Sequence, residues 1–351
     1  MKNLYRTLVL VLIFSSGFAK EHNGKYNKQK NIKKTVSVNA DALLDISNKY
    51  GNVMVTTWDE DKIDIDVLIT ISGDDEDWVD KRLASITIDF DGSKSQYSAK
   101  TLFDKISNSS RRSSMEINYT VKIPKKGHLK IENQYGTIVT HDLLGSTQIS
   151  CKYGKISLGK LQHTSNDIKI DYCSKSTIES VKNAIINAKY SGITIGNFNQ
   201  LHLNTSYTDV SVANGNQLKY ASNYGKIAIG KVGTIEGSGN YLTLKIDQVD
   251  THLKINTNYS NFTLNALSPK ANSITLNSGY TNIKLNHSPD LSFDFDITTK
   301  YANFKSEAAL EYTSRIETQS SKSYKGYYKK SGGSKIVINS GYGNVNLNLI
   351  N

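Results

Sequence analysis

The chain has 351 residues and a formal net charge of +11, with 43 lysines and arginines against 32 aspartates and glutamates. This positive charge does not indicate a nucleic-acid-binding protein, because no recognised DNA- or RNA-binding motif is present and the chain starts with an export signal. No apolar stretch beyond that signal is long enough to span a membrane as a helix.

Residues 1–19 have the features of a secretory signal peptide. These features are a positive start, a short apolar run and small residues at the cleavage position, namely Lys2 and Arg6, Leu8 to Phe14, and Gly17 and Ala19. We therefore expect cleavage after Ala19 and an exported protein, either periplasmic or at the cell surface. An uncleaved amphipathic anchor is the alternative.

Residues 20–40 are rich in lysine and show no apolar period. The lysines are Lys20, Lys25, Lys28, Lys30, Lys33 and Lys34. This composition predicts a basic flexible arm. A solvated tail is the simplest interpretation, and binding to anionic envelope polymers or lipid headgroups is the alternative.

Residues 41–128 are predicted to hold a first repeat and then a small β-rich cap. Alternating apolar residues indicate strands over residues 62–71, 85–90 and 115–123. A short helix with an acidic start is expected from Asp75 to Leu83. A cap is needed because the open end of a stacked β protein is an exposed strand edge.

From residue 129 to 351 the main feature is a tyrosine that recurs every 17 to 21 residues. Its positions are Tyr135, Tyr153, Tyr172, Tyr190, Tyr207, Tyr224, Tyr241, Tyr259, Tyr280 and Tyr301, with Tyr50 upstream and Tyr342 near the end. A period of this length is typical of a stacked repeat. The period breaks at about residues 307–334, which we interpret as an excursion from the stack before the last repeat.

A common frame has apolar residues six and four positions before the tyrosine and three and five positions after it, as at Tyr50, Tyr190, Tyr259, Tyr280 and Tyr342. Around Tyr259 they are Leu253, Ile255, Phe262 and Leu264. The step within each pair is the strand period, and the odd step between the pairs requires a corner, where nearby Gly and Asn would supply the positive φ. The sequence therefore predicts an all-β, monomeric, parallel β-solenoid, a right-handed β-helix with 17–21-residue rungs.

The repeated tyrosine has two interpretations. A structural ladder would stack ring on ring at the corner and close one edge of the core. An aromatic strip would instead bind carbohydrate. The repeat at Tyr172 departs from the frame, because Cys173-Ser174-Lys175 follows it and the next apolar residue is Ile178. We expect a bulge or a shift of register there.

The two cysteines are Cys151 and Cys173. An even number of cysteines in an exported chain is compatible with a disulfide. The frame places these two about three residues apart along neighbouring strands, on the order of 10 Å, against a disulfide limit of about 7 Å. The frame argues against a disulfide, although the irregular repeat at Tyr172 leaves the question open.

We identify no candidate catalytic, cofactor-binding or metal-binding residue, and we expect no enzymatic activity and no cofactor. No nucleophile motif, phosphate-binding loop or paired metal-ligand spacing is present. Acids along the repeats recur at no fixed offset, so stacking builds no acidic site. The loose groups are Asp167, Asp171 and Glu179, then Asp247 and Asp250, then Asp294 and Asp296.

Several lysines fall at rung positions that should face water, namely Lys155, Lys226, Lys245 and Lys284. Lysine at such positions resists pairing between strand edges and keeps a β protein soluble. A basic stripe for an anionic polysaccharide is the alternative.

Several motifs occur together in this chain. They are the signal peptide, Asn48-Lys49-Tyr50-Gly51-Asn52-Val53, Thr56-Thr57-Trp58-Asp59, the acidic helix, the Tyr-Gly repeats and a closing segment from Lys335 to Val345. In this combination the chain resembles the DUF4097-type β-strand-repeat family, often labelled putative adhesins, in envelope proteins of Bacteroidetes-like bacteria. The resemblance implies an exported β-solenoid associated with the envelope, and it supplies no catalytic residues.

These observations predict a non-enzymatic, adhesin-like scaffold of the bacterial cell envelope whose partner is an envelope protein or a polysaccharide. Two alternatives remain open. One is a polysaccharide-active β-helix enzyme, and the other is an envelope-sensing or regulatory accessory protein.

Overall fold

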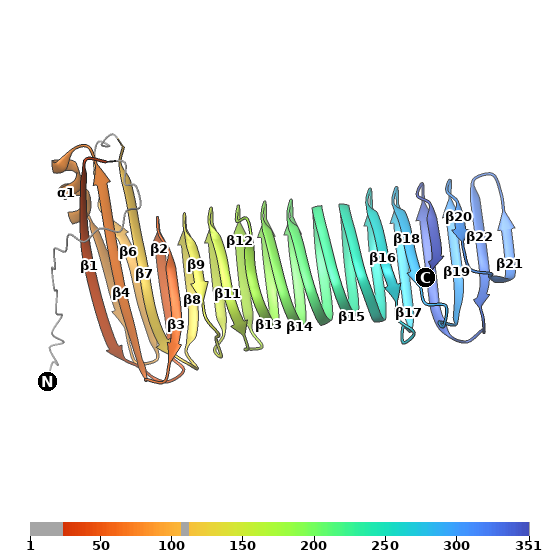
Figure 1. Cartoon of the computed structure of the whole chain (residues 1–351), viewed down its shortest axis with the longest axis horizontal. Helices are drawn as coiled ribbons and strands as arrows, with labels where there is room; N and C mark the ends of the chain where they lie inside the picture. Colours follow the sequence, from red (N-terminus) through yellow and green to blue (C-terminus); the bar gives the residue numbers. More distant parts are fainter. Residues whose placement is uncertain (1–23, 107–111, 351) are drawn as a thin grey trace. The chain divides into compact units, whose positions relative to one another are not determined.

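The computed structural model describes residues 24–106 and 112–350, and the chain divides into two compact units, Met1–Ser176 and Thr177–Asn351. The predicted signal peptide lies outside the described residues. Within them the chain consists mainly of β-strands, with one helix (Figure 1). The predicted all-β class with a short helix is confirmed.

The first unit begins with an antiparallel sheet. β4 (Lys62–Gly73) runs antiparallel to both β1 (Tyr26–Ser37) and β7 (Ser114–Pro124). β5 (Ile86–Gly92) and β6 (Gln96–Phe103) form an antiparallel pair. The predicted strands in β4, β5 and β7 are confirmed, and β6 was missed.

Helix α1 (Glu76–Ala84) starts within one residue of its predicted position. Asp75 is its N-cap, and the Asp75 carboxylate accepts a hydrogen bond from the backbone N–H of Trp78 at 3.1 Å. Such a cap satisfies one of the free donors at a helix start.

The predicted flexible arm is wrong for residues 26–37, because they form β1. Lys28 lies 2.9 Å from Glu76 and 2.7 Å from Asp80, and Lys33 lies 3.0 Å from Asp66. The basic segment and the acidic residues of the cap therefore pair with one another. This segment forms a strand without an apolar period because its backbone groups hydrogen-bond to β4. Its side chains stay partly or fully exposed, so they do not need to be apolar.

Parallel rungs follow in the same unit. β2 (Leu43–Lys49), β8 (His128–Gln134), β10 (Thr147–Lys152) and β12 (Asn166–Asp171) pair in that order. β3 (Val53–Trp58), β9 (Thr137–Thr140) and β11 (Lys155–Leu161) form a second parallel row. On the other side of the first rung, β6 pairs with β2 and β7 pairs with β3, so these strands cover its edge.

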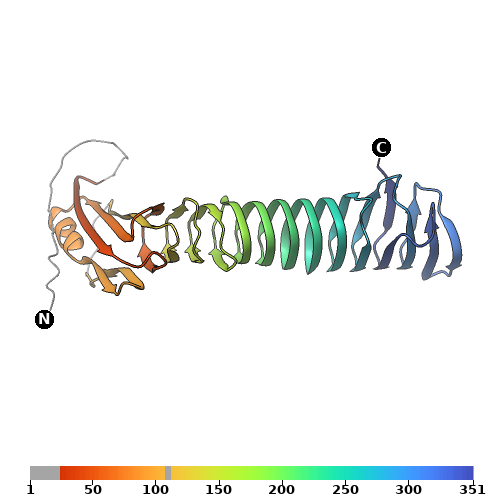
Figure 2. The same ribbon diagram turned by 90° about the horizontal axis from the view of Figure 1, so that it is seen from below.

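The second unit repeats the same arrangement, and Figure 2 shows its chain winding regularly through successive rungs. Equivalent positions pair in parallel, as where Ile193 of β14 meets Val210 of β15. The strands are β13 (Ser176–Lys189), which starts at the unit boundary, β14 (Gly192–Ser206), β15 (Asp209–Asn258), β16 (Asn261–Leu267), β17 (Ser273–Gly279) and β18 (Asn282–His287).

The last repeat does not take the last place in its stack. β23 (Ser334–Gly341) lies between β17 and β19 (Phe293–Lys300) and is parallel to both. β24 (Val345–Leu349) likewise pairs with β18 and β20 (Phe304–Ser306). The excursion forms β21 (Glu311–Glu317) and β22 (Ser321–Tyr328), which pair with one another, and β22 runs antiparallel to β19.

The apolar frame forms the core of the rungs. Leu253, Ile255, Phe262 and Leu264 are each at most 1% exposed. The repeat at Tyr172 is irregular as expected, because strand pairing resumes only at Ser176. The direction of winding stays a prediction.

Candidate functional site

Each ladder tyrosine forms the corner of its rung in the left-handed region of φ. The φ values range from 49° at Tyr190 to 62° at Tyr50. For a non-glycine residue this region costs about 1–2 kcal/mol. The expectation that nearby Gly and Asn supply the positive φ is wrong, because the tyrosine itself adopts it. Among the described residues, Gly225 is the one glycine beside a ladder tyrosine that also has a positive φ, and no asparagine has one.

Hydrogen bonds between rungs hold this corner in place. The tyrosine N–H donates to the carbonyl that precedes the tyrosine of the neighbouring rung, as from Tyr280 to Gly341 at 2.7 Å and from Tyr342 to Lys300 at 2.8 Å. In some rungs a hydroxyl adds a bond across the corner, as from Ser260 to the carbonyl of Asn258 at 2.8 Å.

The tyrosine rings stack into one ladder in each unit. In the first unit Tyr50, Tyr135, Tyr153 and Tyr172 have ring centroids 5.1–5.3 Å apart. In the second unit the centroids are 4.6–5.1 Å apart, in the order Tyr190, Tyr207, Tyr224, Tyr241, Tyr259, Tyr280, Tyr342 and Tyr301. The predicted ring-on-ring ladder is confirmed.

The ladders are exposed rather than part of the core. Exposure ranges from 40% at Tyr50 to 63% at Tyr301. The expectation that they close an edge of the core is therefore wrong, because a tyrosine in the left-handed conformation directs its ring away from the apolar frame. Rings within a ladder have both faces covered by their neighbours, so they present edges and hydroxyls to a ligand, not the open face on which a sugar ring stacks.

The stacking compensates for the strained corner, which can be measured at Tyr224. Tyr224→Phe should be nearly neutral, whereas Tyr224→Ala should cost about 1–3 kcal/mol because two ring pairs are lost. Tyr224→Gly should recover about 1 kcal/mol relative to alanine, because glycine adopts a positive φ freely. Equilibrium urea unfolding measures these differences. Equal stability of the alanine and glycine variants would show that the corner carries no strain.

A groove lies beside the ladder of the second unit, where β15, β17, β23 and β19 run side by side. Its volume is about 590 Å³. The lining residues are Asn256, Thr257, Asn258, Asn277, Ser278, Thr298, Lys300, Asn339, Ser340 and Gly341. Amides and hydroxyls dominate this lining, which contains one charge. Sequence reasoning missed the groove, because it depends on the inserted position of β23.

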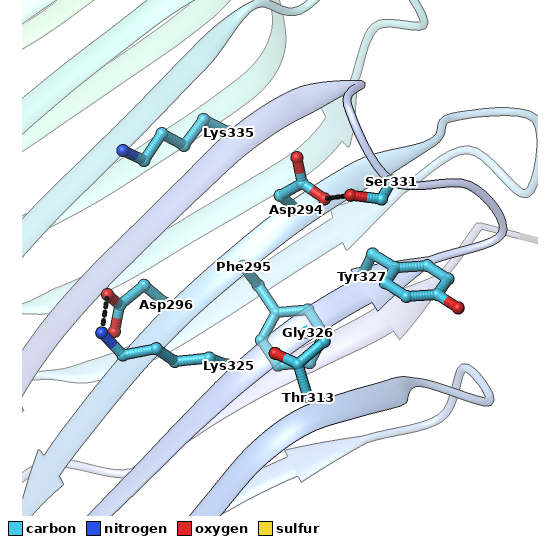
Figure 3. Close-up of a pocket in the computed structure, with 9 residues that line it drawn as sticks. All are labelled: Asp294, Phe295, Asp296, Thr313, Lys325, Gly326, Tyr327, Ser331 and Lys335. Carbon is cyan, nitrogen blue, oxygen red and sulfur yellow. Dashed lines mark hydrogen bonds and ion pairs between the residues drawn. The ribbon is translucent and has the colours of Figure 1, made fainter.

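A smaller pocket of about 250 Å³ lies by the β21–β22 hairpin and contains the acids Asp294 and Asp296 (Figure 3). Asp294 accepts hydrogen bonds from the Ser331 hydroxyl at 2.8 Å and the Gly332 N–H at 3.0 Å. Asp296 forms an ion pair with Lys325 at 3.0 Å. Each carboxylate therefore has a partner that holds it in place, as expected for structural acids.

Cys151 and Cys173 are buried free thiols. The Cys173 thiol donates to the Cys151 carbonyl at 3.3 Å. The predicted offset along the strands is confirmed, because Cys151 is the register partner of Ile170, three residues before Cys173, and the Cys173 thiol still reaches the Cys151 carbonyl. The hydrogen bond with Cys173, and then burial, raise the pKa of the Cys151 thiol.

The four lysines of the predicted stripe are exposed. In the second unit Lys245 and Lys284 share a level on β15 and β18, and Thr263 of β16 separates them. Among residues 24–106 and 112–350, no three His, Cys, Asp or Glu side chains gather as a metal site. No helix in this described part is long and apolar enough to cross a membrane.

Comparison with known proteins gives distant structural similarity. No protein-family model and no curated protein matches the chain. One similar solved structure, a putative cell adhesion protein from Clostridium sporogenes, is 13% identical, with 92% of this chain and 100% of that chain covered and a TM-score of 0.21. Putative adhesins from Bacteroides fragilis and Parabacteroides distasonis are 12% and 10% identical, with 92% of this chain and 97% of each covered and TM-scores of 0.27 and 0.32. At these scores the similarity carries no functional argument, and the family resemblance stays a prediction.

Proposed function

We propose that the chain is an exported, non-enzymatic β-solenoid scaffold that acts as an adhesin-like interaction protein of the bacterial cell envelope. The observation that carries this proposal is the pair of exposed tyrosine ladders. Tyrosine is enriched at interfaces, and a contiguous row of exposed rings is typical of a contact surface. A surface repeated at every rung suits a partner that extends along the rungs, such as an envelope polymer.

Three finer points belong to the same proposal. They are a right-handed winding, which parallel crossovers nearly always have, membership of the DUF4097-type family, and removal of the signal peptide. The alternative of a polysaccharide-active enzyme receives less support, because the acids of the pocket in Figure 3 are already bonded to Ser331, Gly332 and Lys325.

The proposal is tested by cross-linking the tagged protein in its own host and identifying what it captures by mass spectrometry and sugar analysis. We expect polysaccharide-bearing envelope material. The triple variant Tyr207→Asn, Tyr224→Asn and Tyr241→Asn should capture several-fold less, while asparagine keeps the corner conformation.

The matched control is the triple variant Thr194→Asn, Ser211→Asn and Thr243→Asn, which changes exposed residues away from the ladder. Equal capture by the two triple variants would show that the ladder is not the contact surface. One dominant protein partner would favour an accessory role, and release of reducing ends from a glycan would favour an enzyme.

A further inference from the structure

On the outer face of the second unit, two paired strands carry glycine at a position where the other rungs carry a polar side chain. The residue directly before the ladder tyrosine has a polar side chain in six rungs, namely Lys189, Ser206, Asn223, Asn240, Asn258 and Lys300. It is glycine in the other two, at Gly279 and Gly341. These glycines are direct partners on β17 and β23. The Asn258 side chain lies over Gly279, because a Cβ there would be 2.7 Å from the Asn258 amide oxygen, so the open floor is at Gly341.

The floor has clear boundaries. Along the stack it lies between Asn258 on β15 and Lys300 on β19, which are the register partners of Gly279 and Gly341 respectively. A Cβ at Gly341 would meet no atom closer than 4.0 Å, so the space above it is open. The three spacings between the four rungs, at about 4.8 Å each, give the groove a length of about 14 Å, enough for a few sugar rings.

One side of the floor is a row of amides. Asn277 donates to Asn256 at 2.9 Å, and Asn339 donates to Asn277 at 2.9 Å. Each amide has two N–H donors, and this row uses one of them in Asn277 and in Asn339. The row therefore presents further donors, fixed in direction by its own hydrogen bonds, to a ligand in the groove.

Lys300 provides the charge of the groove. In the described chain no carboxylate lies within ion-pair distance of Lys300. Asp296, on the same face of β19, is paired with Lys325. Tyr301, directly after Lys300, ends the ladder and is its most exposed ring at 63%.

This chemistry favours one class of ligand. The backbone groups of these strands pair with one another, so a peptide cannot add as a further strand. A nucleic acid or an anionic membrane would require several cations, and the groove has one. Fixed amides with a single ammonium suit a hydroxyl-rich chain that carries a carboxylate.

We propose that the groove over Gly341 is a binding site for an acidic glycan, with its hydroxyls on the asparagine row and a carboxylate on Lys300. This inference rests on the proposed envelope function and names the ligand class for one face of the second unit.

The test is calorimetric titration of the full chain with polygalacturonate and with hyaluronan. Methyl-esterified polygalacturonate serves as the uncharged glycan, and polyglutamate as the carboxylate polymer without hydroxyls. We expect binding to at least one acidic glycan, with about 10-fold weaker binding of the ester and of polyglutamate, since a hydrogen bond to a charged group is lost in one case and the hydroxyl contacts in the other. No binding of either acidic glycan, or equal binding of polyglutamate, would overturn the proposal.

Two variants locate the site. Gly341→Gln should fill the groove and weaken binding at least 10-fold, and Lys300→Met should weaken it about 10-fold. The control Lys284→Met removes an exposed lysine of β18 outside the groove and should leave affinity unchanged. Unfolding curves of all variants should match the wild type. If Gly341→Gln binds normally while the wild type still captures envelope material in cells, the groove proposal fails and the scaffold proposal stands.

Discussion

Gly343→Ala is expected to destabilise the second unit by more than about 3 kcal/mol, a cost typical of severe packing defects. A Cβ at Gly343 would lie 2.0 Å from the Thr281 carbonyl oxygen and 2.5 Å from its carbon. These are backbone atoms of the neighbouring rung, so relief requires the rungs to move apart. Equilibrium unfolding in urea, followed by circular dichroism, measures the loss.

The matched control is Gly341→Ala, two residues earlier in the same corner. Because a Cβ there meets nothing closer than 4.0 Å, we expect neutrality or a gain of about 0.4–1 kcal/mol from a less flexible unfolded chain. Equal destabilisation by both variants would mean that the corner does not pack as the structure shows.

The rungs could be predicted from the sequence because their determinants are local. Apolar pairs at fixed offsets from the tyrosine can be recognised without knowing which rung lies beside which. Burial of Leu253, Ile255, Phe262 and Leu264 therefore followed from the period alone. The helix was predictable for the same reason, since its Asp75 cap and acidic first turn lie within a few residues.

Contacts between distant segments could not be predicted in this way. β1 lacks an apolar period, and what fixes it is β4 together with Glu76, Asp80 and Asp66, about 30 to 50 residues away. β23 lies between β17 and β19, although other rungs offer similar strand edges. The repeat period does not indicate which of these edges a strand pairs with.

The groove depends on that insertion. Gly279 and Gly341 are 62 residues apart in the chain and become neighbours only because β23 returns to lie beside β17. The one signal in the sequence was glycine before Tyr280 and Tyr342, where most other repeats carry a longer polar residue. The two glycines could be seen in the sequence, but only the order of the strands shows that they lie side by side.

Tyrosine at the corner shows a conflict between local preference and stacking. Asn or Gly would occupy a positive φ with less strain, and both occur nearby, yet the tyrosine takes this conformation in every rung of the ladder. Ring stacking, at about 0.5–1.5 kcal/mol per pair, offsets a cost of about 1–2 kcal/mol only when the neighbouring rungs also carry tyrosine. Each tyrosine corner is therefore stabilised by the tyrosines of the neighbouring rungs.

Ile193→Asp is expected to destabilise the second unit strongly and to lower its Tm. Ile193 is 3% exposed, and its neighbour Thr194 is exposed on the outer face of the same strand. The substitution loses about 1.5–3 kcal/mol of apolar burial and adds about 2–7 kcal/mol for a buried polar group without a partner. The sum is comparable with the whole free energy of unfolding of a typical domain, about 5–15 kcal/mol. Thermal unfolding measures the effect, and Thr194→Asp should remain close to the wild type.

The acid dependence of this variant separates a buried carboxylate from a general packing defect. Burial raises the pKa of a carboxyl in the folded state above its unfolded value of about 3.9, so the charge destabilises at neutral pH and this part of the loss disappears as pH falls towards 4. The difference in Tm between Ile193→Asp and Ile193→Asn should therefore shrink on acidification.

Because each rung contacts only its neighbours, a defect at Ile193 should open β14 first and spread along β15. Unchanged unfolding of Ile193→Asp at pH 7 would show that the apolar frame of the rungs is wrong.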